Sequence, residues 1–129
     1  MEYTFDYHFK GEEEVPSPAL IFYRDQIERN IDGVIVMAGD PRRLWPHIKT
    51  HKTAEIVRML MAKGVRRFKA ATIAEAELCA RSLPGTGEQG QSPYCELEGN
   101  LEVMMAYPLV GPAIARFIQL RWNYPHVNF

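Results

Sequence analysis

The sequence predicts an α/β fold in which strands and helices alternate along the chain. Four short runs are rich in strand-forming residues: 19–23, 44–49, 67–71 and 102–107. Each is followed by a segment with apolar residues at helical spacing. Strict alternation of this kind favours a parallel sheet with right-handed crossovers. A doubly wound sheet and part of a β/α barrel both satisfy the pattern. A complete barrel needs roughly 250 residues, so this chain of 129 residues could supply at most about half of one.

Composition is that of one globular core, with 47% hydrophobic and 24% charged residues. Two cysteines, Cys79 and Cys95, are too few for a disulfide scaffold and are expected to be free thiols in a reducing cytoplasm. No apolar run approaches the roughly 20 residues of a membrane span, so no membrane contact is expected. The first residues lack the basic and apolar regions of a signal peptide.

Positive charge is concentrated in residues 42–69, here called the basic window. It contains nine of the 15 Lys and Arg residues and one acid, Glu55, although the net charge of the chain is −1. A solvated helix face would explain the window, as would a phosphate-bearing ligand or nucleic acid. The balanced total charge and the absence of Lys/Arg-rich tails argue against nucleic acid.

The first elements follow from local signals. Residues 1–18 are expected to form an extended arm because of Glu12–Glu14 and the Pro16-Ser17-Pro18 triplet. A strand is expected at 19–23. Asp25 and Glu28 resemble a capping box that opens a helix, which Gly39-Asp40-Pro41 ends. One face of that helix carries Ile27, Ile31, Val34, Ile35 and Ala38 at helical spacing.

The middle of the chain repeats the alternation. After the strand expected at 44–49, Thr53 can cap a helix that ends at Gly64 and buries Ile56, Met59 and Leu60. The strand at 67–71 leads into a clear capping box, Thr72-x-x-Glu75, which opens a helix to about Arg81.

The last elements lie beyond an irregular stretch, 84–100. A strand is expected at 102–107. The Gly111-Pro112 pair then begins a helix that buries Ile114, Phe117 and Ile118. A further strand begins at 127–129.

The densest group of chemically capable residues is the segment from Trp45 to Lys52. In a helix, His47 and His51 would have the i, i+4 spacing of a zinc pair, but Pro46 and the strand-like flanks argue against a helix. On a strand, His47, Lys49 and His51 would face one way. An amine with a lowered pKa at the carboxyl end of a barrel strand could act as a Schiff-base nucleophile. A surface strand end with solvated bases would explain the segment equally well.

Other patterns are weaker. Residues 85–90 fit G-x-G-x-x-G, and 85–92 nearly fit a P-loop, but they follow a helix and a proline rather than a strand and lack the P-loop lysine. A surface loop explains them better. Cys79 is expected to be a buried small residue, and Tyr107 could line a pocket or simply pack. The methionines at 59, 61, 104 and 105 are expected in the core.

Five sequence blocks, in this order, resemble a known family. The blocks are 18–20 (PAL), 28–31 (ERNI), 46–52 (PHIKTHK), 71–77 (ATIAEAE) and 106–112 (AYPLVGP). Together they resemble the amino-terminal part of the D-threonine aldolase and D-serine dehydratase family, pyridoxal-phosphate enzymes of the alanine racemase fold. The resemblance covers about residues 16–129 apart from the loop 84–100. It implies a partial β/α barrel of about four β/α units, truncated, with residues 1–18 as an arm.

The resemblance implies that Lys49 carries pyridoxal 5'-phosphate as an internal aldimine and that the basic window serves an anionic cofactor. The substrate would be a D-amino acid. A D-threonine aldolase would cleave a β-hydroxy-D-amino acid to glycine and an aldehyde; the alternative, a D-serine dehydratase, would give pyruvate and ammonia. His51, Thr72 and Tyr107 are assigned to the cofactor pocket only by their positions at strand ends.

The chain also departs from the family pattern. Both family branches use a divalent metal near the β-hydroxyl group, but its ligands belong to a carboxyl-terminal β domain that we expect to be absent, so no metal ligand is assigned here. The strand at 19–23 would pair with that domain. Besides a lyase or its amino-terminal piece, the chain could therefore be a non-catalytic fragment or an interaction module, and a homodimer is possible.

Overall fold

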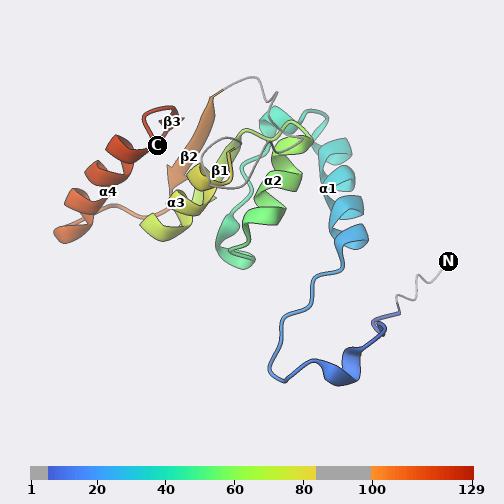
Figure 1. The fold of residues 1–129 in the computed structure, drawn as a ribbon. Helices are drawn as coiled ribbons and strands as arrows, with labels where there is room; N and C mark the ends of the chain where they lie inside the picture. The colour runs from blue at the N-terminus through green and yellow to red at the C-terminus, as the bar shows by residue number, and fades with distance from the viewer. Residues whose placement is uncertain (1–5, 84–99) are drawn as a thin grey trace.

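A computed structural model describes residues 6–83 and 100–129 of the chain (Figure 1). An arm extends away from the body; α1 and α2 then follow each other without a strand between them, and helices and strands alternate only from α2 onward. The elements are η1 (Glu12–Glu14), α1 (Arg24–Ala38), η2 (Pro41–Arg43), η3 (Ile48–Thr50), α2 (Ala54–Ala62), β1 (Arg67–Ala70), α3 (Ile73–Arg81), β2 (Leu101–Met105), α4 (Pro112–Asn123) and β3 (Val127–Asn128).

The three strands form one parallel sheet in the order β1-β2-β3. Phe68 lies opposite Val103, and Leu101 lies opposite Val127. His47 makes a single parallel bridge to Lys69 on the other edge of β1, so a fourth segment touches the sheet there. Three parallel strands joined through helices account for the alternation seen in the sequence.

The core lies on one face of the sheet. Along β1, Phe68 and Ala70 are buried while Arg67 and Lys69 are half-buried, as the two-residue period of a strand requires. α3 packs against both β1 and β2, and it also contacts α2 and α4. The core consists of Ile31, Ile48, Val57, Leu60, Met61, Val65, Phe68, Ala70, Ala76, Cys79, Ala80, Leu101, Val103, Leu120 and Val127.

The strand expected at 19–23 is wrong. Residues 19–22 have no regular structure and are exposed, and Tyr23 already precedes α1 as its N-cap. Among the described residues, no strand pairs with this segment. Backbone groups that lack a neighbouring strand stay hydrated, whatever the strand propensity of the side chains. Within the arm, Tyr23 donates a hydrogen bond to the Tyr7 carbonyl oxygen.

The helix expected after 19–23 is confirmed, but its capping box is not. α1 begins at Arg24, so Asp25 lies inside the first turn, where its carboxylate favours the helix N-terminus electrostatically. Glu28 instead accepts a hydrogen bond from Arg24 Nε at 2.9 Å. Ile31 is the buried residue of the apolar face. Gly39 ends the helix in the left-handed conformation, with φ 77°.

The strand expected at 44–49 is also wrong: residues 44–46 have no regular structure, and His47 makes only an isolated bridge to Lys69. Residues 48–50 form the 3-10 turn η3, so the two-residue alternation stops. Ile48 is fully buried, whereas Lys49 and Thr50 are exposed and His51 is half-buried. The three bases therefore do not share one face of a strand.

The remaining helices agree in position with the sequence but differ in detail. Thr53 precedes α2 without capping it by its side chain, and Val57, Leu60 and Met61 are the buried residues of α2. In α4, Pro112 occupies the first turn as expected. Leu120 is its buried residue, whereas Ile114 and Ile118 are about half exposed, at 49% and 50%.

Several expectations fall on residues 84–99, which lie outside the described residues: most of the irregular stretch, both glycine motifs and Cys95. Cys79 is a buried free thiol, as expected. Met61 is buried and Met59 and Met105 pack against the core, but Met104 is 46% exposed because it lies on the other face of β2. Of the helices in residues 6–83 and 100–129, none has the length and apolarity that crossing a bilayer requires.

Candidate functional site at the carboxyl edge of the sheet

Strand register brings the assigned site residues to one edge of the sheet. His47, Lys69 and Met104 occupy one row, since His47 bridges Lys69 and Lys69 lies opposite Met104. The chain continues past this row in the same direction in all three segments. Lys49 lies two residues beyond the row, and Thr72 and Tyr107 lie three beyond it. This carboxyl edge is where ligand sites occur in parallel α/β folds.

Residues 47–53, here called the lysine turn, are fixed by their own hydrogen bonds. His47 Nδ1 accepts from the Lys49 N–H at 3.3 Å, and the Thr50 hydroxyl donates to the His47 carbonyl oxygen. The N–H groups of His51 and Lys52 both donate to the Ile48 carbonyl oxygen. Because Ile48 is fully buried, the turn is anchored in the core while Lys49 stays outside it.

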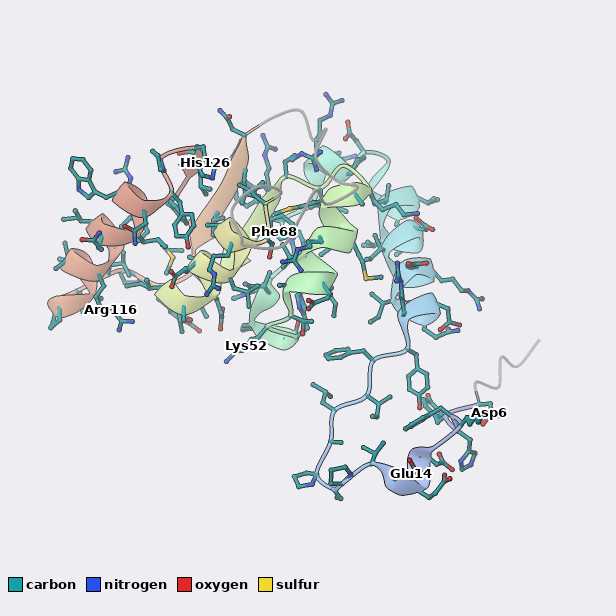
Figure 2. All side chains as sticks on the ribbon, viewed as in Figure 1. Asp6, Glu14, Lys52, Phe68, Arg116 and His126 are labelled. Carbon is teal, nitrogen blue, oxygen red and sulfur yellow. The ribbon has the colours of Figure 1, made fainter. Side chains whose placement is uncertain are left out.

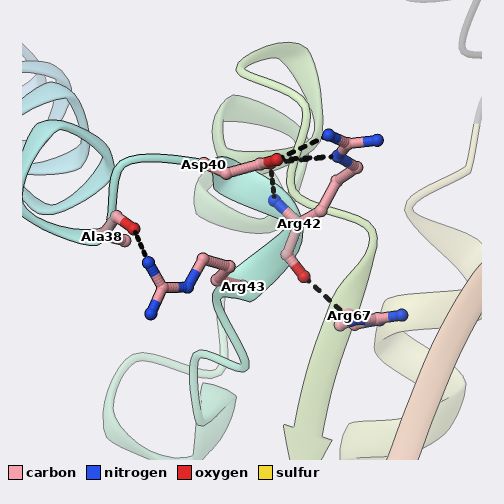
Figure 3. Close-up of polar contacts among 5 residues, drawn as sticks. All are labelled: Ala38, Asp40, Arg42, Arg43 and Arg67. Atoms are coloured by element: carbon pink, nitrogen blue, oxygen red, sulfur yellow. Dashed lines mark hydrogen bonds and ion pairs between the residues drawn. The ribbon is translucent and has the colours of Figure 1, made fainter.

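Most charges of the basic window already have partners within the protein. Figure 3 shows three of them: Arg42 bonds the Asp40 carboxylate, Arg43 donates to the Ala38 carbonyl oxygen at the end of α1, and Arg67 donates to the Arg42 carbonyl oxygen. Arg42 lowers the pKa of Asp40 to about 2. Arg67 also pairs with Glu102 across the strands and lies over the Trp45 ring, 5.5 Å from its centroid.

The remaining cations of the window behave similarly, with two exceptions. Lys52 pairs with Glu75, Arg58 with Glu55, and Lys63 with Asp32. Arg66 donates to the Met61 and Val65 carbonyl oxygens. Within the part of the chain that the structure describes, the amines of Lys49 and Lys69 make no hydrogen bond or ion pair. Local structure therefore uses most of the positive charge, and the Lys49 amine is left available at the carboxyl edge.

Thr72 and Glu75 close the start of α3. The Thr72 hydroxyl oxygen accepts from the Glu75 N–H at 3.2 Å, which confirms the predicted N-cap. Glu75 Oε2 accepts in return from the Ala71 N–H at 2.7 Å. The Thr72 hydroxyl proton is not used by this bond, so the hydroxyl can still donate toward the edge.

One ring nitrogen of His51 is bonded to the backbone. Its Nδ1 accepts from the Thr53 N–H at 3.1 Å, so a neutral ring carries its proton on Nε2. Desolvation of the half-buried ring lowers the pKa of His51 below its usual value of 6.5. At neutral pH, His51 is therefore an uncharged hydrogen-bond donor within the lysine turn.

Tyr107 follows the end of β2 with its side chain 60% exposed. Its hydroxyl has no hydrogen-bond partner among the described residues, so the alternative in which it packs with a backbone-bonded hydroxyl does not hold. Ala106, just before it, still belongs to the sheet, because its N–H donates to the Ala70 carbonyl oxygen at 2.7 Å.

Two residues near this edge were missed as site residues. Glu75 is buried, with 4% of its surface exposed, and Lys52 adopts a left-handed backbone with φ 48°. The signals were present: a glutamate at the capping-box position of α3, and a second lysine three residues after Lys49. Burial of the glutamate could not be read from the sequence, because it depends on how α3 packs against the lysine turn.

The described residues contain no other arrangement with comparable chemistry. Residues 6–83 and 100–129 hold no group of three His, Cys, Asp or Glu side chains that could bind a metal ion. A groove of about 400 Å³ lies between the start of α1 and α2; its lining includes Phe22, Ile27 and Ile56, and Thr53 at the end of the lysine turn borders it. The chain matches no known protein-family model, no curated protein and no solved structure.

Proposed function

We propose that the chain is part of a pyridoxal-phosphate-dependent lyase acting on D-amino acids, with Lys49 as the residue that binds the cofactor covalently. The observation that carries the proposal is the Lys49 amine, unpaired among the described residues and held on a hydrogen-bonded turn at the carboxyl edge with Thr72 and Tyr107. Most other cations of the basic window are engaged elsewhere. The family resemblance of the PHIKTHK block supports the same residue.

The arrangement of the sheet supports a β/α barrel as the parent fold. In a barrel all helices cover the outer face of the strands, whereas a doubly wound sheet has helices on both faces. Here the face with Phe68 and Val103 is buried, and the face with Lys69 and Met104 is partly open. We infer that the open face is the inner side of a partial barrel of the alanine racemase type.

The proposed chemistry begins at the Lys49 amine. Lys49 would hold pyridoxal phosphate covalently through its side-chain amine, which is the nucleophile that such a cofactor requires. When bound, the cofactor withdraws electrons from the substrate α-carbon. The neutral ring of His51 and the hydroxyls of Thr72 and Tyr107 offer hydrogen bonds toward the same edge. These groups would orient the ring of the cofactor.

The preferred reaction is aldolase-type cleavage of a β-hydroxy-D-amino acid to glycine and an aldehyde, and elimination from D-serine is the alternative. A divalent metal would polarise the β-hydroxyl group in either reaction. The described residues do not fit such a metal, so no step is assigned to one.

Cofactor binding can be tested directly. Incubation with pyridoxal phosphate should give an absorbance band near about 420 nm, and borohydride reduction should leave a covalent adduct that peptide mapping finds on Lys49. K49A should lose both. K69A is the matched control, because Lys69 is the other lysine of the basic window without a partner among residues 6–83 and 100–129, and it should be dispensable. Absence of the band, or an adduct spread over several lysines, would refute the proposal.

Product analysis then separates the two lyases. With D-threonine, an aldolase should release glycine and acetaldehyde. With D-serine, a dehydratase should release pyruvate and ammonia. A chain that carries the cofactor on Lys49 but converts neither substrate would retain the cofactor assignment and lose the lyase assignment.

A second candidate, a non-catalytic interaction module, is favoured by one observation. Large apolar side chains are exposed on the arm and on two helices, including Leu20 at 74%, Met37 at 82% and Trp122 at 77%. A homodimer would cover part of this surface. Size-exclusion chromatography with light scattering should then give twice the chain mass, and a monomer at high concentration would count against self-association.

A further inference from the structure

The ion pair between Lys52 and Glu75 joins the two segments that make the carboxyl edge. Lys52 belongs to the lysine turn, and Glu75 belongs to the first turn of α3; Lys52 Nζ lies 3.7 Å from Glu75 Oε1. The two side chains differ in environment, with 64% of Lys52 but only 5% of Glu75 exposed. In Figure 2, Lys52 projects from the body where α2 begins, while Phe68 lies inside.

Glu75 is buried more deeply than its role at the start of α3 requires. A capping box works on an exposed helix start, where the carboxylate keeps its water. Burying a carboxylate costs free energy unless hydrogen bonds and a counter-charge compensate it. Glu75 receives both, from the Ala71 N–H and from Lys52. The burial therefore ties Glu75 to the lysine turn as well as to its own helix.

Lys52 has an unfavourable backbone in the same place. Its φ of 48° is left-handed, a conformation that a residue with a Cβ seldom adopts unless its surroundings impose it. The Lys52 N–H donates to the Ile48 carbonyl oxygen at 2.8 Å, which closes the lysine turn around Lys49. The left-handed conformation of Lys52 is therefore stabilised by two interactions: the hydrogen bond of its N–H to Ile48 and the ion pair of its amine with Glu75.

We propose that Glu75 is a positioning residue that, through Lys52, holds the lysine turn in the shape that presents Lys49 at the carboxyl edge. The predicted effect on cofactor attachment rests on the proposed function. The claim that Glu75 holds the lysine turn does not, because it depends only on the contacts of that turn. Lys49 and Glu75 need not touch. Loss of the pair frees Lys52 to leave the left-handed region, and the Ile48–Lys52 bond that encloses Lys49 opens.

Substitutions can separate the pair from the cap. E75Q keeps an oxygen that accepts from the Ala71 N–H, so α3 stays capped, but it removes the charge that faces Lys52. K52M removes the same pair from the other side, and K52R restores the charge. E55Q is the matched control: it also breaks an ion pair on a helix, that of Glu55 with Arg58, where Glu55 is 73% exposed.

Two measurements decide the inference. Hydrogen exchange of the Lys52 amide should become about tenfold faster in E75Q and K52M, and stay unchanged in E55Q and K52R. The apparent affinity for pyridoxal phosphate, read from the absorbance band, should fall about tenfold in the first two variants and recover in K52R. The melting temperature is measured alongside to separate local opening from unfolding.

The outcomes distinguish the two proposals. Unchanged Lys52 exchange in E75Q would overturn the inference, whatever the cofactor does. Equal cofactor affinity in wild type, E75Q and K52M would show that the ion pair does not position Lys49, and it would leave the proposed function intact. A wild-type chain that shows no cofactor band would refute the proposed function, and the exchange experiment would still decide whether Glu75 holds the turn.

Discussion

At the scale of single residues, burial controls the chemistry of His51 and Cys79. The His51 ring is half-buried and already uses Nδ1, so protonation would place a charge where water is scarce. Cys79 is fully buried, and desolvation with the nearby Glu75 charge raises the pKa of its thiol to about 12. The burial of Cys79 was expected from the sequence, whereas the half-burial of His51 and its bond to Thr53 depend on the folded turn.

His51 gives a prediction about pH. Its pKa is lower in the folded chain than the usual 6.5, so between these two values the unfolded chain binds more protons. The free energy of unfolding should therefore fall as the pH drops below about 6.5. H51N, whose amide oxygen can still accept from Thr53, should flatten this part of the profile. Urea titrations from pH 8 to pH 5 measure the effect, and NMR titration with the ring pKa above 6.5 would contradict it.

Cys79 gives a prediction about reactivity. A thiol pKa raised from 9.0 to about 12 leaves roughly a thousandfold less thiolate at pH 8. In a C95S background, alkylation of Cys79 should be slow in the native protein and fast after denaturation. Mass spectrometry over time follows the reaction. Comparable rates in both states would show that Cys79 is accessible.

At the scale of elements, the positions of the helices were predicted, but only one of the three expected N-caps, Thr72, is confirmed. The Thr72 cap was predicted because it lies within four residues of its partner, Glu75. The Asp25 box failed although the letters matched, because α1 begins one residue before Asp25. Strands were harder: the segment 19–23 has strand composition but no partner among the described residues, and 48–50 turns because Ile48 enters the core.

Two glycines should respond to alanine in opposite directions. Gly64 has φ 90°, and a Cβ there would lie 3.1 Å from Pro41 Cγ. G64A should therefore lower the free energy of unfolding by roughly 1–2 kcal/mol. Gly33 lies inside α1 with nothing within 4 Å of an added Cβ, so G33A should raise it by roughly 0.5–1 kcal/mol. Urea denaturation compares the two, and equal signs would contradict the assigned backbone conformations.

The N-cap of α3 can be tested with a conservative pair. T72A removes the oxygen that accepts from the Glu75 N–H and should cost about 1 kcal/mol of stability. T72S keeps that oxygen and should retain most of the stability. Denaturant titration measures both variants. A T72A protein as stable as wild type would mean that the cap contributes nothing in solution.

At the scale of the whole molecule, one-sided packing of the sheet is the dominant feature. The side chains of β1 and β2 that face α3 are buried, while those on the opposite face are charged or partly exposed. The same arrangement separates the core from the carboxyl edge, so the lysine turn can be rigid without being buried. It also leaves apolar side chains of α4 such as Trp122 in contact with water.

The packing of the sheet predicts unequal responses from its two faces. Phe68 is fully buried, so F68A should cost about 3–5 kcal/mol and unfold much of the population at moderate urea. Met104 lies on the open face and is 46% exposed. M104A should therefore lower the free energy of unfolding by less than about 1 kcal/mol. Equal losses of stability would show that the two faces are not packed as described.

The sequence by itself determined what short-range forces decide: the alternation of helices and strands from α2 onward, the Thr72 cap of α3 and the glycine that ends α1. Only the tertiary structure decided which of these residues meet. The parallel register brings Lys49, Thr72 and Tyr107 to one edge, and packing of α3 buries Glu75 against Lys52. Contacts between residues distant along the chain depend on the closure of the whole core, which no local pattern encodes.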